Sequence, residues 1–332
     1  MNQYDSRQDQ RPLAIYYEHP EWFKPLFAEL ERRSVPYVRL LAHEHHFDPA
    51  EQQSPYSLVV NRMSPSAYTR GHEGAVFYTS SFLAYLDQIG ANVLNGYGTY
   101  TYEISKARQL GLLEQLGVRY PRARVINHAS HAVAASYGLT FPVVVKPNIG
   151  GSGAKIVRFD DESDLRAAAA AGAIDLGIDH TALVQEYLPA QGNSIVRVEV
   201  LNGEYLYAIR LRLTRDEFNL CPADYCRVPA AGDATVGLAD GVSGRSAAIE
   251  GYTPPAAVIE NVKQITRAAG IEVGGVEYLE NERDGEIYYY DVNALSNFVA
   301  DAPRVVGFDP LRRLVDFILR RAEFAEAVPA GV

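Results

Sequence analysis

The sequence predicts an α/β protein in which a small parallel sheet comes first and β-hairpins come later. Between Leu13 and about Asn95, short apolar segments alternate with helical segments, an order typical of a parallel sheet with helices on its faces. Two hairpin signals follow, at Asn202-Gly203 and at Arg283-Asp284-Gly285. Because 332 residues are too many for one small domain, we expect two or three subdomains that share an interface.

The first subdomain is expected over residues 1–118. Its expected strands are Ala14–Tyr16, Tyr37–Leu41, Leu58–Asn61 and Asn92–Leu94, and its expected helices are Glu21–Arg33, Ser80–Gln88 and Lys106–Leu116. Ligands of open α/β sheets bind at the carboxyl ends of the strands. Arg62, which follows Leu58-Val59-Val60, is therefore a candidate for holding a carboxylate or a phosphate.

A second subdomain is expected over residues 119–190, and its main feature is a lysine at the end of an apolar strand. Lys146 closes Phe141–Pro147, where an unpaired ammonium would be costly to bury, so a phosphate is a fitting partner. The run Gly150–Lys155 follows, and its backbone N–H groups are able to close over phosphate oxygens. The run matches neither a P-loop nor a dinucleotide fingerprint, and an ordinary glycine turn is the alternative.

The third subdomain, residues 191–332, begins with a hairpin around Asn202-Gly203. Arg197, Arg210 and Arg212 fall at strand spacings that would aim their guanidinium groups toward a bound phosphate or carboxylate. For each arginine alone, a solvent-facing position is the simpler interpretation.

A second hairpin near the C-terminus carries three oxygen-bearing side chains. If Arg283-Asp284-Gly285 is a three-residue loop, Glu277 pairs directly with Asp291, whereas a two-residue turn would place the two acids on opposite faces. Asn293, two residues further, shares the face of Asp291. Such a set suits Mg²⁺ when phosphates supply the other ligands, and a solvated hairpin face is the alternative.

The order of these segments resembles the ATP-grasp superfamily, most closely the branch of ribosomal-protein glutamate ligase and glutathione synthetase. The resemblance extends from Tyr102 to the C-terminal helix, and the earlier region matches in its α/β pattern only. It implies an ATP-grasp fold: an N-terminal parallel α/β subdomain, then lid and C-terminal α+β subdomains with ATP between them.

The resemblance also implies roles for individual residues. The implied ATP contacts are Lys106 and Lys146 at the phosphates, Gly151, Ser152 and Gly153 in the lid, Gln185, Glu186, Tyr187 and Leu188 at the adenine, and Asn219. The implied Mg²⁺ ligands, which would also accept Mn²⁺, are Glu277, Asp291 and Asn293. The implied catalytic arginines are Arg197 and Arg210 or Arg212, and Arg62 and Arg304 are the candidates for anionic substrates.

Four departures from the family pattern stand out. The second metal carboxylate is usually a glutamate, and here it is Asp291. The acid that often stands two residues before the first hairpin arginine is replaced by Ile195. Asn219 lies closer to Phe218 than its family counterpart does, and residues 221–251 have no counterpart that we can place.

Composition excludes some classes of partner. With 31 basic and 41 acidic residues, the formal charge of −10 argues against nucleic acid or an anionic membrane. The polar start and the lack of a long apolar run lead us to expect a cytoplasmic protein, and a homo-oligomer is left open. Cys221 and Cys226 are expected to be reduced thiols, and His43, His45 and His46 a solvated loop rather than a metal site.

We therefore expect an ATP-dependent carboxylate–amine ligase that forms an amide or peptide bond through an acyl phosphate and releases ADP. Its substrates would be a small carboxylic acid and an amine, with amino acids or a peptide as the candidates. Two alternatives keep the nucleotide site: a phosphotransferase or carboxylase, and a catalytically silent nucleotide-binding protein.

Overall fold

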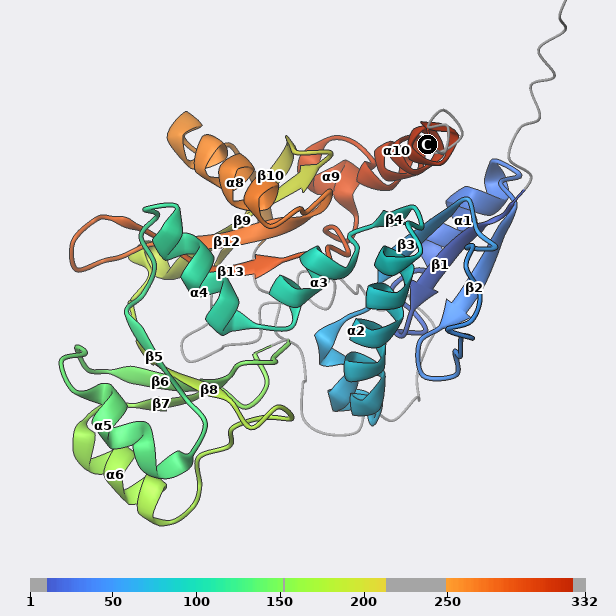
Figure 1. Cartoon of the computed structure of the whole chain (residues 1–332). Coiled ribbons are helices and arrows are strands. Elements are labelled where there is room, and N and C mark those ends of the chain that lie inside the picture. Colours follow the sequence, from blue (N-terminus) through green and yellow to red (C-terminus); the bar gives the residue numbers. More distant parts are fainter. Residues whose placement is uncertain (1–10, 152, 213–248, 325–332) are drawn as a thin grey trace, which may run out of the picture.

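The computed structural model describes residues 11–151, 153–212 and 249–324, which form three sheets that follow one another along the chain (Figure 1). The first sheet is parallel and has the strand order β2-β1-β3-β4. Its strands are β1 Leu13–Tyr17, β2 Tyr37–Leu41, β3 Leu58–Arg62 and β4 Val93–Leu94. The parallel N-terminal sheet is therefore confirmed. In the described part of the chain, no helix has both the length and the apolar character needed to cross a membrane.

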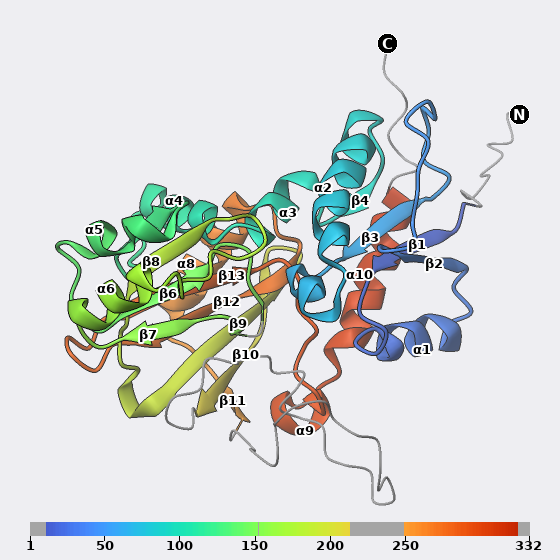
Figure 2. The same ribbon diagram turned by 90° about the horizontal axis from the view of Figure 1, so that it is seen from below.

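Helices cover both faces of this sheet. The helix α2 (Glu73–Gln88) packs on one face, where Tyr16 and Phe82 meet in a buried cluster. The other face is covered by α1 (Lys24–Arg32) and by α10 (Pro310–Phe324), whose Leu314 and Ile318 join the core. The last helix thus returns to the first sheet, beside α1 (Figure 2), although the sequence had grouped it with residues 191–332.

The second sheet is antiparallel, with the order β5-β8-β6-β7. Its strands are β5 Ala123–Ile126, β6 Val143–Pro147, β7 Val157–Phe159 and β8 Ala182–Glu186. The helices α5 (Ala132–Ser136) and α6 (Glu162–Ala170) cover its outer face and bury one apolar cluster (Figure 1). We call β5–β8 with these two helices the lid.

The third sheet has the order β11-β10-β9-β12-β13, and all of its strand pairs are antiparallel. Its strands are β9 Ser194–Leu201, β10 Glu204–Arg212, β11 Ile249–Tyr252, β12 Val273–Glu280 and β13 Ile287–Asn293. The helix α8 (Ala256–Ala268) packs on one face of it, whereas α3 (Tyr97–Glu103) and α4 (Lys106–Gln115) contact β13. The short helix α9 (Ala302–Val306) contacts β10 and β11.

Both hairpins form where the sequence predicts them, but the second has an irregularity that the sequence did not reveal. Asn202 and Gly203 make a two-residue turn with positive φ at both positions. Glu277 does pair with Asp291, yet the loop has four residues, 282–285, because Asn281 N–H donates to the Glu286 carbonyl. A bulge restores the expected register: Tyr290 has no paired residue on β12.

One asparagine side chain ties the first sheet to the third. The amide of Asn95, just after β4, donates to the carbonyls of Val273 and Ala294 at 2.6 and 2.5 Å. Its oxygen accepts from the backbone N–H groups of Glu272 and Val273 at 2.9 and 3.3 Å. Asn95 is 1% exposed, so these four backbone groups depend on one buried side chain rather than on water.

We predict that Asn95→Ala lowers the free energy of unfolding by about 2–4 kcal/mol, because it leaves buried donors and acceptors unpaired. Urea unfolding followed by circular dichroism measures the change. The matched control is Asn92→Ala, whose partly buried amide donates to the carbonyls of Ser57 and Arg321. Equal losses in both variants would contradict the special role of Asn95.

Candidate functional site

A cavity of about 370 Å³ lies between the lid and the third sheet and extends to the edge of the first sheet. This size suits a small organic molecule. The cavity is lined from the lid by residues of β6, β7 and β8, from the third sheet by residues of β9, β12 and β13, and from the first subdomain by Trp22, Ser64, Pro65 and Ser66.

Glu277, Asp291 and Asn293 face this cavity together, as the hairpin register predicts. Glu277 on β12 lies directly opposite Asp291 on β13, and the Asn293 amide donates to Asp291 Oδ2 at 3.1 Å. The bulge has an added effect, since Tyr290 and Asp291, although adjacent, both line the cavity. The two carboxylates and the amide oxygen form a compact set of hard oxygen ligands.

Arg197 lies between two carboxylates on the floor of the cavity. It pairs across the sheet with Glu277, whose Oε1 accepts from its Nη1 at 3.1 Å, and its Nε donates to Glu199 Oε1 at 2.6 Å. All three residues are buried. Glu199, two residues after Arg197, thus provides the acid that the sequence lacks at Ile195, two residues before it.

A glycine makes room for Glu199. Any Cβ at Gly275, the neighbour of Glu199 on β12, would lie 2.9 Å from Glu199 Oε2. A larger residue at this position would therefore displace the carboxylate that holds Arg197.

Lys106, the first residue of α4, forms an ion pair with Asp291. The helix start is held from the lid by Asn148, whose carbonyl accepts from Lys106 N–H at 3.3 Å and whose Oδ1 accepts from Ala107 N–H at 2.9 Å. Burial opposes the charge of Lys106, but Asp291 outweighs it, so the pKa of Lys106 lies above its ordinary value. The ammonium is therefore held charged beside the metal-type ligands.

Lys146, on β6 of the lid, also lines the cavity but lacks an ion-pair partner among residues 11–151, 153–212 and 249–324. It is 6% exposed. Burial, reinforced by the nearby charge of Lys106, lowers its pKa to about 7. An anionic ligand in the cavity would therefore stabilise the charged form of this buried lysine, as the sequence argument expects.

The pKa values of the carboxyl groups in the cavity are also shifted by burial and by neighbouring charges. Burial and the charge of Asp291 raise the pKa of Glu277 to about 7, and burial also raises the pKa of Glu103 to about 7. The pKa of Asp291 is held low by Lys106 despite its burial. Two facing carboxylates that penalise each other's charge fit a divalent cation, so the residues present are suited to Mg²⁺.

The four residues from Gln185 to Leu188 line the cavity together, at the junction of β8 and the third subdomain. Glu186 accepts from Thr140 N–H at 2.8 Å, and the guanidinium of Arg158 on β7 lies 4.6 Å from the centre of the Tyr187 ring. The segment thus forms a connection between the lid and the third sheet with a fixed backbone.

Gly151 and Gly153 line the cavity, whereas Ser152 and Asn219 lie outside the described residues. Gly151 passes very close to the first subdomain: a Cβ there would lie 2.5 Å from Ser66 Cβ. This close approach is a reason for glycine at the position that phosphate binding alone would not supply.

Two predicted catalytic arginines are not brought into this site. Arg210 and Arg212 pair across the sheet with Val196 and Ser194, so they lie on the face opposite Arg197, the face that α8 covers. Both lie near Glu250, at 3.7 and 3.8 Å, and Arg210 stacks on Tyr252. The spacing of the three arginines suggested that they share one cavity. Successive residues of a strand point to opposite faces of the sheet, however, and the register places Arg210 and Arg212 on the face away from Arg197.

The two proposed substrate arginines also differ from expectation, since neither lines the cavity in the described chain. Arg62 is fully buried behind it and donates to the Ser296 carbonyl, so it supports the cavity wall instead of facing a ligand. Arg304 on α9 is exposed and pairs with its neighbour Asp301. Burial lowers the pKa of Arg62 to about 10, partly offset by Glu199.

The sequence analysis missed several cavity residues: Glu103, Gln109, Arg158 and Glu199. Glu103 accepts from the backbone N–H groups of Ala294 and Leu295, and Gln109 bonds both N–H and carbonyl of Val292. These two side chains, from α3 and α4, hold β13 in place around Asp291 and Asn293. No sequence signal distinguishes them from the other polar residues of these helices, YGTYTYE and KARQLGLLEQ.

Comparisons with known proteins identify the fold. Residues 104–220 match the family model of the RimK-like ATP-grasp domain. The chain is similar to the ATP-grasp ligase PsnB complexed with minimal precursor, with 18% identity, a TM-score of 0.62 and coverage of 93% of this chain and 98% of that one. It is also similar to a RimK domain protein ATP-grasp from Sphaerobacter thermophilus DSM 20745, with 18% identity, a TM-score of 0.62 and coverage of 92% and 99%.

A third similar structure is D-cycloserine synthetase DcsG, with 17% identity, a TM-score of 0.59 and coverage of 95% of this chain and 99% of that chain. No curated protein sequence matches the chain. At these identities the likeness shows the fold, which is the ATP-grasp fold that the sequence motifs predict.

We predict that Lys146→Met stabilises the protein near neutral pH. The folded-state pKa of Lys146, about 7, lies below the ordinary value of 10.5, so between these values the unfolded chain binds more protons. The cost of the buried ammonium is therefore greatest below about pH 7 and vanishes near pH 10.5. The variant should gain about 1–4 kcal/mol at about pH 6.5 and progressively less as the pH rises.

Urea unfolding of both proteins at several pH values measures this difference, with the exposed Lys24→Met as control. A gain that stays constant with pH, or a loss at neutral pH, would contradict the assignment of Lys146 as a buried, unpaired cation.

Proposed function

Taking the ATP-grasp fold as the premise, we propose that this protein is an ATP-dependent carboxylate–amine ligase. It would form an amide or peptide bond through an acyl-phosphate intermediate and release ADP and phosphate. The observation that carries the proposal is the convergence of two lysines, one arginine and the set Glu277, Asp291 and Asn293 on one cavity. This combination suits the γ-phosphate of a nucleotide next to a second anionic group.

The nucleotide would lie between the lid and the third sheet. Gln185 to Leu188 would line the adenine, because they connect the two parts with a fixed backbone and are joined in the cavity by apolar Leu279. Lys146 and Lys106 would contact the phosphates, which would supply the anionic partner that Lys146 lacks among the described residues. The glycines 151 and 153 would allow the lid backbone to approach the same phosphates.

Mg²⁺ would be held by Glu277, Asp291 and Asn293. A bound ion supplies charge compensation for phosphate oxygens. The residues around it fix the ligands in place: Arg197 orients Glu277, Lys106 orients Asp291, and Asn293 donates to Asp291. Support for the pairing of nucleotide and ion comes from a PsnB structure described as a complex with minimal precursor, Mg and ADP.

The chemistry would depend on positioning and on electrostatics. The guanidinium of Arg197 and the ammonium of Lys146 would offset the charge that gathers as a substrate carboxylate attacks the γ-phosphorus. The amine would then displace phosphate from the acyl carbon. The lid and Ser66, which meet at Gly151, would limit the access of water to the acyl phosphate.

The substrates would be a small carboxylic acid and an amine, with amino acids or a peptide as the candidates. This class is supported by the size of the cavity and by the neighbours, one of which is named a D-cycloserine synthetase and another of which holds a precursor peptide. The rival activities, phosphoryl transfer or carboxylation without an amine, differ in their products. A silent protein is disfavoured because both lysines and all three metal-type ligands line the cavity.

The first experiment is a screen for ADP release with Mg·ATP and pairs of amino acids, with products identified by mass spectrometry. A parallel series replaces the amine by hydroxylamine, which traps an acyl phosphate as a hydroxamate. A new amide with an equal amount of ADP supports the proposal. ADP release with a stable phosphoryl product, or incorporation of bicarbonate, would assign the site to a rival activity instead.

We predict that Arg197→Ala lowers the rate of ADP release at least about 100-fold, because it removes a cation beside the phosphoryl group and frees Glu277. The matched control is Arg210→Ala, on the opposite face of the same sheet, which should change the rate less than about threefold. Steady-state rates with the acid and amine found in the screen make the comparison. Similar losses in both variants would contradict the assignment of the active face.

The metal-type ligands generate a separate prediction. Asp291→Asn should reduce ADP release at least about 100-fold at any Mg²⁺ concentration while the protein remains folded, because phosphate charge is left uncompensated. Circular dichroism confirms folding, and turnover is measured over a Mg²⁺ titration. Full turnover in this variant would remove Asp291 from the ion site.

A further inference from the structure

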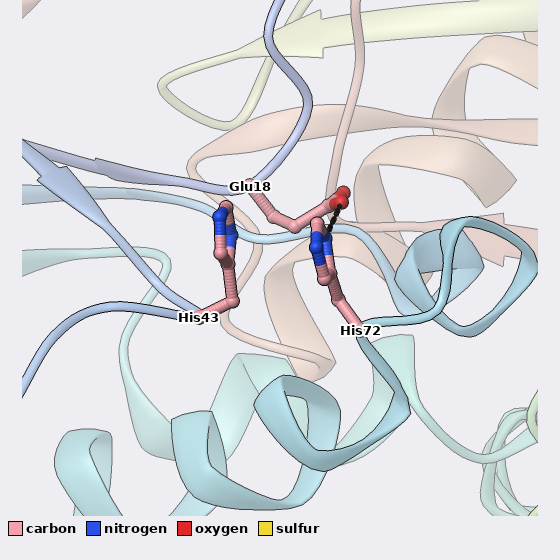
Figure 3. A group of neighbouring side chains, drawn as sticks. All are labelled: Glu18, His43 and His72. Atoms are coloured by element: carbon pink, nitrogen blue, oxygen red, sulfur yellow. Dashed lines mark hydrogen bonds and ion pairs between the residues drawn. The ribbon is translucent and has the colours of Figure 1, made fainter.

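A second group of ligand-type side chains lies at the carboxyl edge of the first sheet, outside the cavity described above. Glu18 directly follows β1, His43 lies two residues after β2, and His72 immediately precedes α2. One ligand atom from each residue lies within 4.8 Å of the others (Figure 3). Three segments far apart in the sequence thus converge at the edge where parallel α/β sheets bind ligands.

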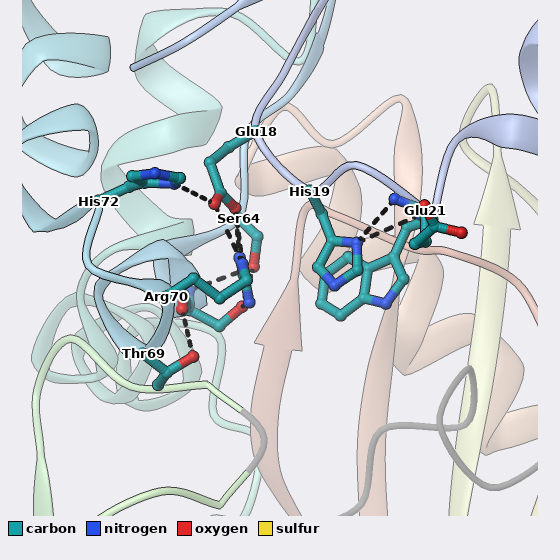
Figure 4. A network of polar contacts seen from close by, with 9 residues as sticks. Glu18, His19, Glu21, Ser64, Thr69, Arg70 and His72 are labelled. Atoms are coloured by element: carbon teal, nitrogen blue, oxygen red, sulfur yellow. Dashed lines mark hydrogen bonds and ion pairs between the residues drawn. The ribbon is translucent and has the colours of Figure 1, made fainter. Parts of the chain in front are cut away.

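Glu18 is the buried member of this group, and its carboxylate is held in place by Arg70. Its side chain is 0% exposed, and its two oxygens share one bifurcated hydrogen bond from Arg70 Nε, at 3.1 and 3.0 Å, while Oε2 also accepts from Arg70 Nη2 (Figure 4). Arg70 and His72 thus hold the carboxylate in a defined orientation before any ligand arrives.

The two histidines supply nitrogen atoms on the solvent side of Glu18. His72 Nδ1 lies 2.6 Å from Glu18 Oε1, and the His43 ring stacks on the His72 ring with centroids 3.8 Å apart. Their side chains are 25% and 33% exposed, so solutes reach them. The other histidines of the 43–46 segment differ: His45 is half-buried beside Tyr78, and His46 lies outside the group.

We propose that Glu18, His43 and His72 form a binding site for one divalent transition-metal ion of the imidazole-preferring kind, represented by Zn²⁺. Two imidazoles and one carboxylate are a ligand set that binds such an ion and leaves positions for water. Arg70 completes the site from behind, because it holds the carboxylate in the way that outer hydrogen bonds orient metal ligands. Mg²⁺, which prefers oxygen, is a poor competitor here.

Binding requires one local movement. The His43 and His72 rings are parallel to within 7°, and a single ion does not lie in the planes of two stacked rings. The exposed His43 ring turns so that its nitrogen faces Glu18 Oε1, and the ion takes the place of the hydrogen bond between His72 and Glu18. Arg70 keeps its bonds from Nε and Nη2 to the other carboxylate oxygen, Oε2, throughout.

The site has a direct connection to the cavity. Arg70 Nη1 donates to Ser66 Oγ at 3.2 Å, and Ser66 lines the cavity beside Gly151. Its guanidinium also lies 5.4 Å from the centre of the Trp22 ring, another lining residue. An ion on Glu18 therefore acts on the same arginine that supports one wall of the cavity.

The test is a titration of the full chain with ZnCl₂ by calorimetry, without nucleotide and with Mg²⁺ in excess to saturate the oxygen site. Cys221 and Cys226 are changed to serine in all samples, because thiols bind Zn²⁺ elsewhere in the chain. One Zn²⁺ per chain is expected. His43→Ala and His72→Ala should each weaken binding at least about tenfold, whereas His46→Ala, in the same segment, should leave it unchanged.

Co²⁺ provides a second readout that does not depend on affinity alone. Its visible absorption should show nitrogen coordination in the parent protein and lose it in the double variant His43→Ala with His72→Ala. Because both histidines are partly exposed, these variants are expected to fold. Glu18→Gln is not used, because it would leave the charge of Arg70 without its carboxylate partner. Binding that is absent in the parent, or equal in the parent and both histidine variants, would overturn the proposal.

Discussion

The charge balance inside the cavity is the constraint on which the rest of the structure depends. Arg197 is shared by Glu199 and Glu277, Lys106 is bound to Asp291, and Lys146 is buried without an ion pair among the described residues. Such groups are costly to desolvate, and a fold keeps them together only when rigid elements enforce the arrangement. Here the charged groups are held together because strands of the lid and of the third sheet line the cavity and the edge of the first sheet adjoins it.

The enforcing contacts are polar and come from outside the hairpin that carries the ligands. Asn95 fixes the start of β12 and the end of β13, Gln109 fixes Val292, and Glu103 fixes the chain just after Asn293. These side chains replace missing strand neighbours along the edge strand β13, which would otherwise present unpaired backbone groups to the cavity. The strand that carries Asp291 and Asn293 is therefore held in place by hydrogen bonds from outside the hairpin.

The sequence predicted the fold well where hydrophobic period and turn chemistry decide it. The parallel first sheet, the Asn202-Gly203 turn and the pairing of Glu277 with Asp291 all appear in the structure. The pairing of Glu277 with Asp291 was predicted from a three-residue loop. The loop has four residues, and the bulge at Tyr290 compensates for the extra one. The alternation of apolar and polar residues does not reveal where a strand carries an extra residue, so the bulge was not predictable from the sequence.

The failures have a common physical cause: side chains were placed by spacing without knowing which face of the strand the core covers. Arg210 and Arg212 are an even number of residues apart and share a face, but that face belongs to α8. Arg62 lies at the right edge of the first sheet, yet the Ser296 carbonyl covers it. Glu199 was overlooked because an acid in an alternating strand has the same pattern as a solvated residue.

The most direct test of the central claim, that this cavity joins a carboxylate to an amine through an acyl phosphate, is the fate of carboxylate oxygen. The acid that supports ADP release is labelled with ¹⁸O in its carboxyl group and turned over with unlabelled Mg·ATP. The account predicts one labelled oxygen in the released phosphate and one in the amide. Phosphate without label, or label in AMP, would contradict it.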